Sequence, residues 1–148
     1  MLTPNRILYC SDFSENSERA GRIALSYART FEADLLVVNV INIRFLQHPA
    51  LIGLPVYGDA VDSVEKRAEE QLREISERFK RQMPAVQTFS RKGIPGEEIL
   101  KLAEEQSVDL IIMGTHGRTG LSHLLVGSTA EHVVRMAKCP VLTVKSQD

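Results

Sequence analysis

The sequence predicts an α/β fold of three layers, in which a five-stranded parallel sheet carries helices on both faces. Apolar segments alternate strictly with amphipathic ones along the chain, and strands joined by helices are normally parallel neighbours with right-handed crossovers. The segments 35–41 and 110–113 are continuously apolar, which is typical of strands covered on both faces. The length of 148 residues suits a single domain, 1–148, with one core.

The first half of the chain begins with the order strand, helix, strand. Residues 6–10 and 34–41 are apolar runs of strand length, and the second is rich in β-branched residues. Between them, apolar residues recur at steps of three and four, which predicts a helix over 14–31. The same spacing predicts a helix from about 60 to 82. The intervening segment 42–60 is long for such a connection, so it is either a lid or interface or an ordinary surface loop.

The second half continues this alternation. The predicted elements are a strand at 85–91, a turn at 93–96, a helix at 97–106, a strand at 108–113 and a last strand at 140–145. A last helix precedes that strand, because Ala130, Val133, Val134 and Ala137 follow a helical spacing. The prediction is therefore five strands and four helices.

Composition excludes several classes of protein. The 18 Lys and Arg residues nearly balance the 19 Asp and Glu residues, with no long run of one sign, so a nucleic-acid partner is not expected. No apolar run approaches the ~18 residues of a membrane span, and the first residues do not resemble a signal peptide, so a soluble cytoplasmic protein is expected. Cys10 and Cys139 are expected to be small buried hydrophobes. The four histidines, His48, His116, His123 and His132, lack the spacing of a zinc site.

Four of the nine glycines lie together after the predicted strand 108–113, at Gly114, Gly117, Gly120 and Gly127. The loop leads into the last helix, whose N-terminus offers unpaired N–H groups to an anion such as a phosphate. In this interpretation Gly114 and Gly117 bring the backbone close to a polyphosphate, and Arg118 adds charge. Alternatively, the glycines only make turns and end a strand, and Ser128 is simply the N-cap of its helix.

Asp12 follows the first predicted strand, at the edge of the sheet where ligands bind in open α/β folds. Its carboxylate would accept ribose hydroxyls or hold Mg²⁺ through water, or it is an ordinary residue before the likely N-cap Ser14. The pattern of a Walker loop is absent, as is a dinucleotide fingerprint after the first strand. Ordinary hydrolytic and dehydrogenase functions are therefore not favoured.

The spacing Gly114-x-x-Gly117, nine residues, Gly127-Ser128 resembles the G-2x-G-9x-G-[S/T] motif of the ATP-binding branch of the universal stress protein family. The similarity spans the chain, through the segments 12–14, 38–40, 93–99, 109–117 and 137–145. It implies a sheet of order 3-2-1-4-5, an adenine nucleotide alpha hydrolase-like arrangement. It also implies a homodimer joined through the last strand, Val141, Leu142, Thr143 and Val144, and an unpaired edge strand of alternating apolar residues independently favours such pairing.

The resemblance also implies a site for ATP and Mg²⁺. Asp12 would meet the ribose or Mg²⁺, the Val40 main chain would pair with the adenine edge, and Met113 would support the base. The loop residues implied to contact the ribose and phosphates are Gly114, His116, Gly117, Gly127, Ser128 and Thr129. This chain departs from many ATP-binding relatives at Ala130, where they carry a hydroxyl residue.

Three functions follow from these expectations. The first is an ATP-binding, dimeric regulatory module of the stress response that reports nucleotide state to a protein partner. The second is a slow Mg²⁺-dependent ATPase, since phosphoryl transfer needs a positioned nucleophile that no motif here supplies. The third is a protein-interaction scaffold whose nucleotide site has lost its ligand, an alternative that Ala130 keeps open.

Overall fold

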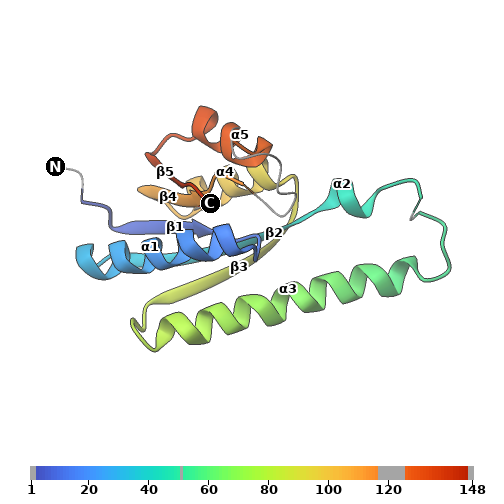
Figure 1. Cartoon of the computed structure of the whole chain (residues 1–148), viewed down its shortest axis with the longest axis horizontal. Coiled ribbons are helices and arrows are strands. Elements are labelled where there is room, and N and C mark those ends of the chain that lie inside the picture. The colour runs from blue at the N-terminus through green and yellow to red at the C-terminus, as the bar shows by residue number, and fades with distance from the viewer. Residues whose placement is uncertain (1–2, 51, 117–125, 147–148) are drawn as a thin grey trace.

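The computed structural model describes residues 3–50, 52–116 and 126–146 and confirms the predicted three-layer α/β fold (Figure 1). Five parallel strands form one sheet in the order β3-β2-β1-β4-β5. The strands are β1 (Arg6–Cys10), β2 (Asp34–Asn42), β3 (Val86–Gly93), β4 (Leu110–Gly114) and β5 (Val141–Val144). The helices are α1 (Glu15–Phe31), α2 (Ile43–Leu46), α3 (Tyr57–Lys80), α4 (Pro95–Glu105) and α5 (Ser128–Met136).

The core lies in two layers, one on each face of the sheet. Successive side chains of a strand point to opposite faces, so Ile7 and Tyr9 of β1 pack beneath α1 and α3, while Leu8 and Cys10 pack beneath α4 and α5. Ile111 and Ile112 of β4 divide in the same way. Burial on both faces explains why these strands are continuously apolar in sequence.

Helix α1 begins where the sequence predicts it. Ser14 is its N-cap, with extended φ and ψ angles, and its hydroxyl accepts a hydrogen bond from the Ser17 amide at 3.2 Å. Glu15 and Glu18 stand in the first turn, where the helix dipole favours negative charge. The cap therefore sets where α1 begins, and four residues separate this helix from the end of β1.

The segment 42–60 is more ordered than the prediction. Strand β2 runs to Asn42, whose side chain accepts a hydrogen bond from the Arg44 amide at 3.0 Å and so begins the short helix α2. Helix α3 starts at Tyr57, and the Tyr57 hydroxyl donates to the Leu46 carbonyl at 2.8 Å. Of the described residues in this segment, only 47–50 and 52–56 lie outside helices and strands, and α2 with the start of α3 forms an arm that projects beyond the sheet (Figure 1).

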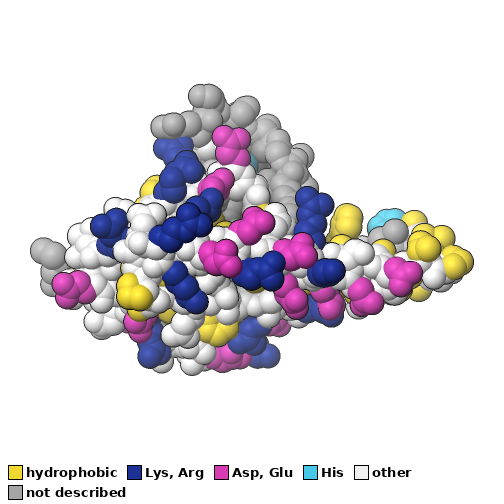
Figure 2. Space-filling view, turned by 90° about the horizontal axis from the view of Figure 1, so that it is seen from below, with side chains coloured by type: hydrophobic (Ala, Val, Ile, Leu, Met, Phe, Trp, Pro, Cys, Tyr) yellow, Lys and Arg dark blue, Asp and Glu magenta, His cyan; other side chains and the backbone are white. Residues whose placement is uncertain are grey.

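The surface of α1 and α3 carries charges of both signs, interleaved, whereas hydrophobic side chains gather at the end of the arm (Figure 2). The exposed apolar residues of the arm are Phe45, Ile52, Leu54 and Val56. Cys10 is buried as predicted, but Cys139 is only partly buried because it follows α5 near the rim of a smaller hollow beside α4. In the part of the chain that the structure describes, no helix has the length and apolar character needed to cross a bilayer.

Candidate functional site

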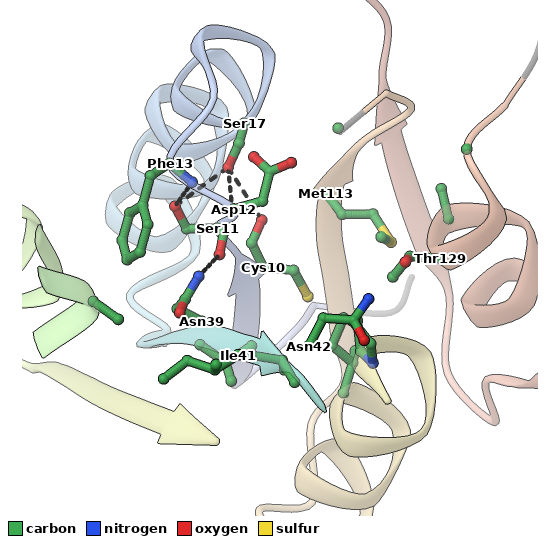
Figure 3. A pocket seen from close by; sticks show the side chains of 18 of the residues that line it. Cys10, Ser11, Asp12, Phe13, Ser17, Asn39, Ile41, Asn42, Met113 and Thr129 are labelled. Atoms are coloured by element: carbon green, nitrogen blue, oxygen red, sulfur yellow. Dashed lines mark hydrogen bonds between the residues drawn. The ribbon is translucent and has the colours of Figure 1, made fainter. Parts of the chain in front are cut away.

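A cavity of about 710 Å³ opens at the carboxyl ends of β1, β2 and β4. The connection from β1 leads towards β2, and β4 lies on the other side of β1, so the winding of the sheet reverses between β1 and β4. Two loops part at such a switch point and leave a crevice, which is where ligands bind in open α/β sheets. Figure 3 shows the β1 loop on one side of this cavity, with Met113 and Thr129 on the other.

The β1 loop presents Asp12 to the cavity. Its Oδ1 atom accepts hydrogen bonds from the Ser14 amide at 2.9 Å and from the Ser14 hydroxyl at 2.5 Å. Phe13 follows with a φ of 64°, a left-handed conformation that a bulky residue seldom adopts. Such a conformation costs of order 1 kcal/mol or more and persists where the surroundings impose it. Here it turns the Phe13 ring away from Asp12, into the apolar cluster at the root of the arm (Figure 3).

A buried polar network supports this loop from below. The Asn39 side chain donates to the Ser11 carbonyl at 2.8 Å, and the Ser17 hydroxyl lies 3.3 Å from the Ser11 hydroxyl. The Tyr9 hydroxyl donates to the Ser17 carbonyl at 2.8 Å. Burial raises the pKa of Tyr9 above its usual 10.0, with the hydrogen bonds from Ser11 and Ser17 acting in the opposite direction. The network holds the loop in place, and its members Ser11, Ser17 and Asn39 also line the cavity, whereas Tyr9 lies beneath it.

At the site, strand β2 extends beyond the end of strand β1. Its pairing with β1 ends at Cys10 and Val38, and the Val38 carbonyl accepts a hydrogen bond from the Ser11 amide at 2.8 Å. Alternate residues of a parallel strand direct their backbone groups to the same side. The N–H and C=O of Val40 therefore point towards the β1 side, beyond the end of the β1 strand, where Val40 lines the cavity.

Helix α5 begins at the opposite wall. Its N-cap is Gly127, with φ −60° and ψ 153°, and no side-chain hydrogen bond caps this end in the described residues. The alternative in which Ser128 is the N-cap is therefore wrong, because Ser128 is already the first residue of the helix. The uncapped first turn, together with the Ser128 and Thr129 side chains, leaves donors at the cavity wall that suit an anion.

Three further predicted residues lie on the same wall or beside it. Met113, 5% exposed, packs in the core beneath α4 and α5 and lines the cavity, as do Gly114 and His116. The His116 Nδ1 atom lies 2.9 Å from the Thr115 hydroxyl, whereas its Nε2 atom is buried with no hydrogen-bond partner among the described residues. Gly117 and Arg118 lie outside the described residues.

Sequence reasoning missed Asn16, on the first turn of α1. Its side chain donates to the His116 carbonyl at 3.0 Å, across 100 residues of sequence. No local pattern marks such a contact, because a polar residue in the first turn of a helix is ordinary.

The side of the cavity towards the arm was also missed. Phe45, Arg67 and Gln71, on α2 and α3, line it together with Ile41. Among the described residues that line the cavity, Asp12 is the one carboxylate and Arg67 the one Lys or Arg. The amphipathic spacing of α3 predicted a helix, but it could not predict that this helix extends beyond the sheet. Ala130 is 2% exposed and packs in the core while bordering the cavity, so its methyl group serves the packing of α5.

Comparison with known proteins places this geometry in one family. The family model described as the universal stress protein family matches residues 4–145. The universal stress protein MJ0577 of Methanocaldococcus jannaschii is 34% identical over 97% of this chain and 96% of its own length. Its solved structure matches with a TM-score of 0.79 at 30% identity, covering 99% of each chain.

Two other solved structures share the fold. The universal stress protein UspA of Lactobacillus plantarum, 26% identical, matches with a TM-score of 0.85 over 98% of this chain and 100% of that one. A universal stress protein in complex with cAMP, 23% identical, matches with a TM-score of 0.69 over 99% of this chain and 100% of that one, which shows the common fold. The matched span and the identity to MJ0577 together establish that this chain belongs to the universal stress protein family.

Proposed function

We propose that this protein binds an adenine nucleotide, ATP with Mg²⁺, in the cavity at the switch point of its sheet. The observation that carries the proposal is the convergence of three kinds of group on one cavity: the start of α5, which no described side chain caps, the Asp12 carboxylate and the Val40 backbone. Each matches a different part of a nucleotide, and they come from three separate segments: the loop after β1, the strand β2 and the helix α5. The cavity, about 710 Å³, has the volume of an ordinary small-ligand pocket.

The phosphates belong at the start of α5. A helix N-terminus presents N–H donors and a partial positive charge, which suits phosphate oxygens without a cluster of Lys or Arg. The Ser128 and Thr129 hydroxyls supply further donors at the same wall. Gly127 leaves the approach to this wall unobstructed, while Gly117 and Arg118 of the motif are expected to complete the phosphate loop together with Gly114 and His116.

The base and ribose belong between β2 and β4. The Val40 N–H and C=O offer one donor and one acceptor, the pair that the edge of an adenine requires, and Met113 gives an apolar, polarisable surface for the ring. Asp12 suits the ribose hydroxyls as an acceptor. A universal stress protein that shares this fold at 23% identity has been solved in complex with cAMP, which supports the proposal of a nucleotide in this cavity.

Mg²⁺ fits this site only when it is bound together with the nucleotide phosphates. The described residues contain no cluster of three or more His, Cys, Asp or Glu side chains suited to a metal. Mg²⁺ typically keeps several waters and is held by one or two carboxylates plus substrate phosphates, so Asp12 with the phosphates is a sufficient set. When bound, the metal would neutralise phosphate charge.

The nucleotide serves a regulatory role in this proposal. We place the protein in the cytoplasm as a homodimer joined through β5, acting in the stress response by presenting a nucleotide-dependent surface to a protein partner. The exposed apolar residues of the arm, Phe45 and Val56 among them, are a suitable surface, since contiguous exposed apolar groups commonly mark interaction sites. The same residues also favour the second candidate, a scaffold that binds partners without nucleotide.

Hydrolysis, if present, is expected to be slow. Fast phosphoryl transfer needs an oriented nucleophile and cationic groups at the transferring phosphate. Asp12 is held by Ser14, and Arg67 lies on α3, whereas the phosphate wall is formed by α5. The described residues thus supply a cradle for phosphates rather than a set of catalytic groups.

The test is isothermal titration of nucleotide-stripped protein with Mg-ATP, comparing two variants of one residue. Ser128→Ala removes a hydroxyl, whereas Ser128→Pro also removes the first N–H of α5, and proline is well tolerated at the first helical position. We expect a wild-type dissociation constant near 1 μM, about −8 kcal/mol, a modest loss in Ser128→Ala and a loss of about tenfold or more in Ser128→Pro. Absence of binding by the wild type at millimolar ATP, with the fold intact, leaves the scaffold as the function.

A further inference from the structure

Asn16 connects the two loops that form the cavity. It lies two residues after the N-cap Ser14, so it is rigidly joined to the Asp12 loop. Its Nδ2 atom donates to the His116 carbonyl at 3.0 Å, at the start of the glycine-rich segment that follows β4. A single side chain thus spans the switch point. The loops after β1 and β4 part there and are not joined by strand pairing.

Gly114 lies in close contact with Asn16. Its φ does not lie in the left-handed region, so no backbone conformation demands glycine there. A Cβ atom at Gly114 would instead stand 2.6 Å from Asn16 Nδ2 and 3.2 Å from Asn16 Cγ. No ordinary Cβ contact is so short, so a larger residue at 114 would force the Asn16 amide to move and would break its hydrogen bond to His116.

The Asn16 amide is satisfied at its nitrogen but not at its oxygen. The Oδ1 atom is buried and has no hydrogen-bond partner among the described residues. Buried polar atoms of this kind are rare in proteins and call for a reason. If residue 16 served packing alone, an apolar side chain of similar size would suit the position better than asparagine. The hydrogen bond donated by Nδ2 therefore explains why an amide stands there.

We propose that Asn16 is a positioning residue of the nucleotide site, which holds the start of the phosphate loop against α1, and that Gly114 is glycine to make room for it. The bond to the His116 carbonyl works with two neighbouring ones. The Thr115 amide donates to Val144 of β5 at 3.0 Å, and the Gly127 amide donates to the Thr115 carbonyl at 2.7 Å. Asn16 thereby sets where Thr115 lies and, through it, where α5 begins.

The inference about Gly114 is tested by a double-variant cycle that needs no nucleotide. We expect Gly114→Ala to lower the urea midpoint in the wild-type background and to have little or no effect in the Asn16→Ala background, since the atoms it collides with are then gone. If Gly114→Ala lowers the urea midpoint equally in both backgrounds, the cost does not come from contact with the Asn16 side chain. The inference that Gly114 makes room for Asn16 would then be overturned.

The positioning role of the hydrogen bond from Asn16 to the His116 carbonyl is tested by hydrogen exchange at the Thr115 and Gly127 amides. Asn16→Asp preserves the shape of the side chain but cannot donate when ionised, so we expect it and Asn16→Ala to raise both exchange rates by tenfold or more. Ser26→Ala, an exposed change farther along α1, is the matched control and should leave them unchanged. Unaltered rates in both Asn16 variants would overturn the proposal.

The effect on the ligand rests on the proposed function. We expect Mg-ATP to bind Asn16→Ala and Asn16→Asp at least fivefold more weakly than wild type and Ser26→Ala. If wild type binds and the Asn16 variants bind equally well, Asn16 does not position the site. If wild type does not bind, the proposed function fails, while the exchange and unfolding measurements still decide whether Asn16 holds the loop.

Discussion

The Oδ1 atom of Asp12 accepts two hydrogen bonds from Ser14, one from the amide at 2.9 Å and one from the hydroxyl at 2.5 Å. The Ser14 hydroxyl in turn accepts from the Ser17 amide at 3.2 Å. The carboxylate that faces the cavity is therefore oriented by the cap of α1. A ligand that meets Asp12 encounters a side chain whose orientation has already been set, which lowers the entropic cost of binding.

The negative charge of Asp12 and its ability to accept hydrogen bonds from Ser14 can be tested separately. Asp12→Asn keeps an oxygen that accepts from Ser14 but removes the negative charge, so we expect Mg-ATP to bind roughly tenfold more weakly, about 1.4 kcal/mol. ATP without Mg²⁺ should bind at least as well as to wild type, because the repulsion between carboxylate and phosphates is gone. Titration calorimetry with and without Mg²⁺ measures both. Equal losses under the two conditions would show that Asp12 does not act through the metal.

Two helical glycines make a matched pair for stability. A Cβ at Gly21 of α1 would stand 2.7 Å from the ring of Tyr9, which is 1% exposed and tied to Ser17. A Cβ at Gly58 of α3 would meet nothing within 4 Å. Overpacking costs about 1–3 kcal/mol, whereas alanine improves helix propensity by up to about 1 kcal/mol. We expect urea unfolding to show Gly21→Ala destabilised by about 1 kcal/mol and Gly58→Ala stabilised by about 0.5 kcal/mol.

Alkaline conditions should destabilise this protein through its buried β1 strand. Burial raises the pKa of the Cys10 thiol far above its usual 9.0, and it raises the pKa of Tyr9 above 10.0. Above pH 9 the unfolded chain releases these protons while the folded chain retains them, so stability falls as the pH rises. Each group contributes up to about 1.4 kcal/mol per pH unit.

A cysteine variant isolates one part of this loss. Cys10→Ala should lose about 1.4 kcal/mol less than wild type between pH 8 and pH 10, because the thiol no longer titrates. Urea unfolding at the two pH values gives the difference. Parallel pH profiles for the two proteins would mean that Cys10 does not carry the effect.

The sequence predicted what depends on local pattern. Continuous apolar runs gave the buried strands, and helical spacing with Ser14 as a cap gave α1. The strand order came only from the family resemblance, because pairing of β1 with β4 joins residues about a hundred positions apart. The contact between Asn16 and Gly114 escaped prediction for the same reason. Helix α2 was missed because four residues are too few to show a period.

The backbone of β5 shows which of its groups face the free edge of the sheet. The Pro140 and Val144 carbonyls accept hydrogen bonds from the Ile111 and Thr115 amides on the β4 side. Since alternate residues of a parallel strand bond to the same neighbour, Val141 and Thr143 direct their N–H and C=O groups outwards. An edge of this kind pairs readily with another strand, and in the proposed dimer it pairs with its own copy.

Thr143→Pro is therefore the sharpest test of the dimer. Proline is tolerated at an edge strand when its missing N–H faced outwards, so pairing with β4 should persist while one hydrogen bond to the second copy is lost and its ring obstructs the approach. We expect light scattering to show a monomer where wild type is a dimer, with circular dichroism unchanged. Lys138→Ala, an exposed residue just before β5, is the control and should remain dimeric. Because no residue of β5 lines the cavity, we expect Mg-ATP affinity to be retained in the monomer. A Thr143→Pro protein that stays dimeric would move the interface away from β5.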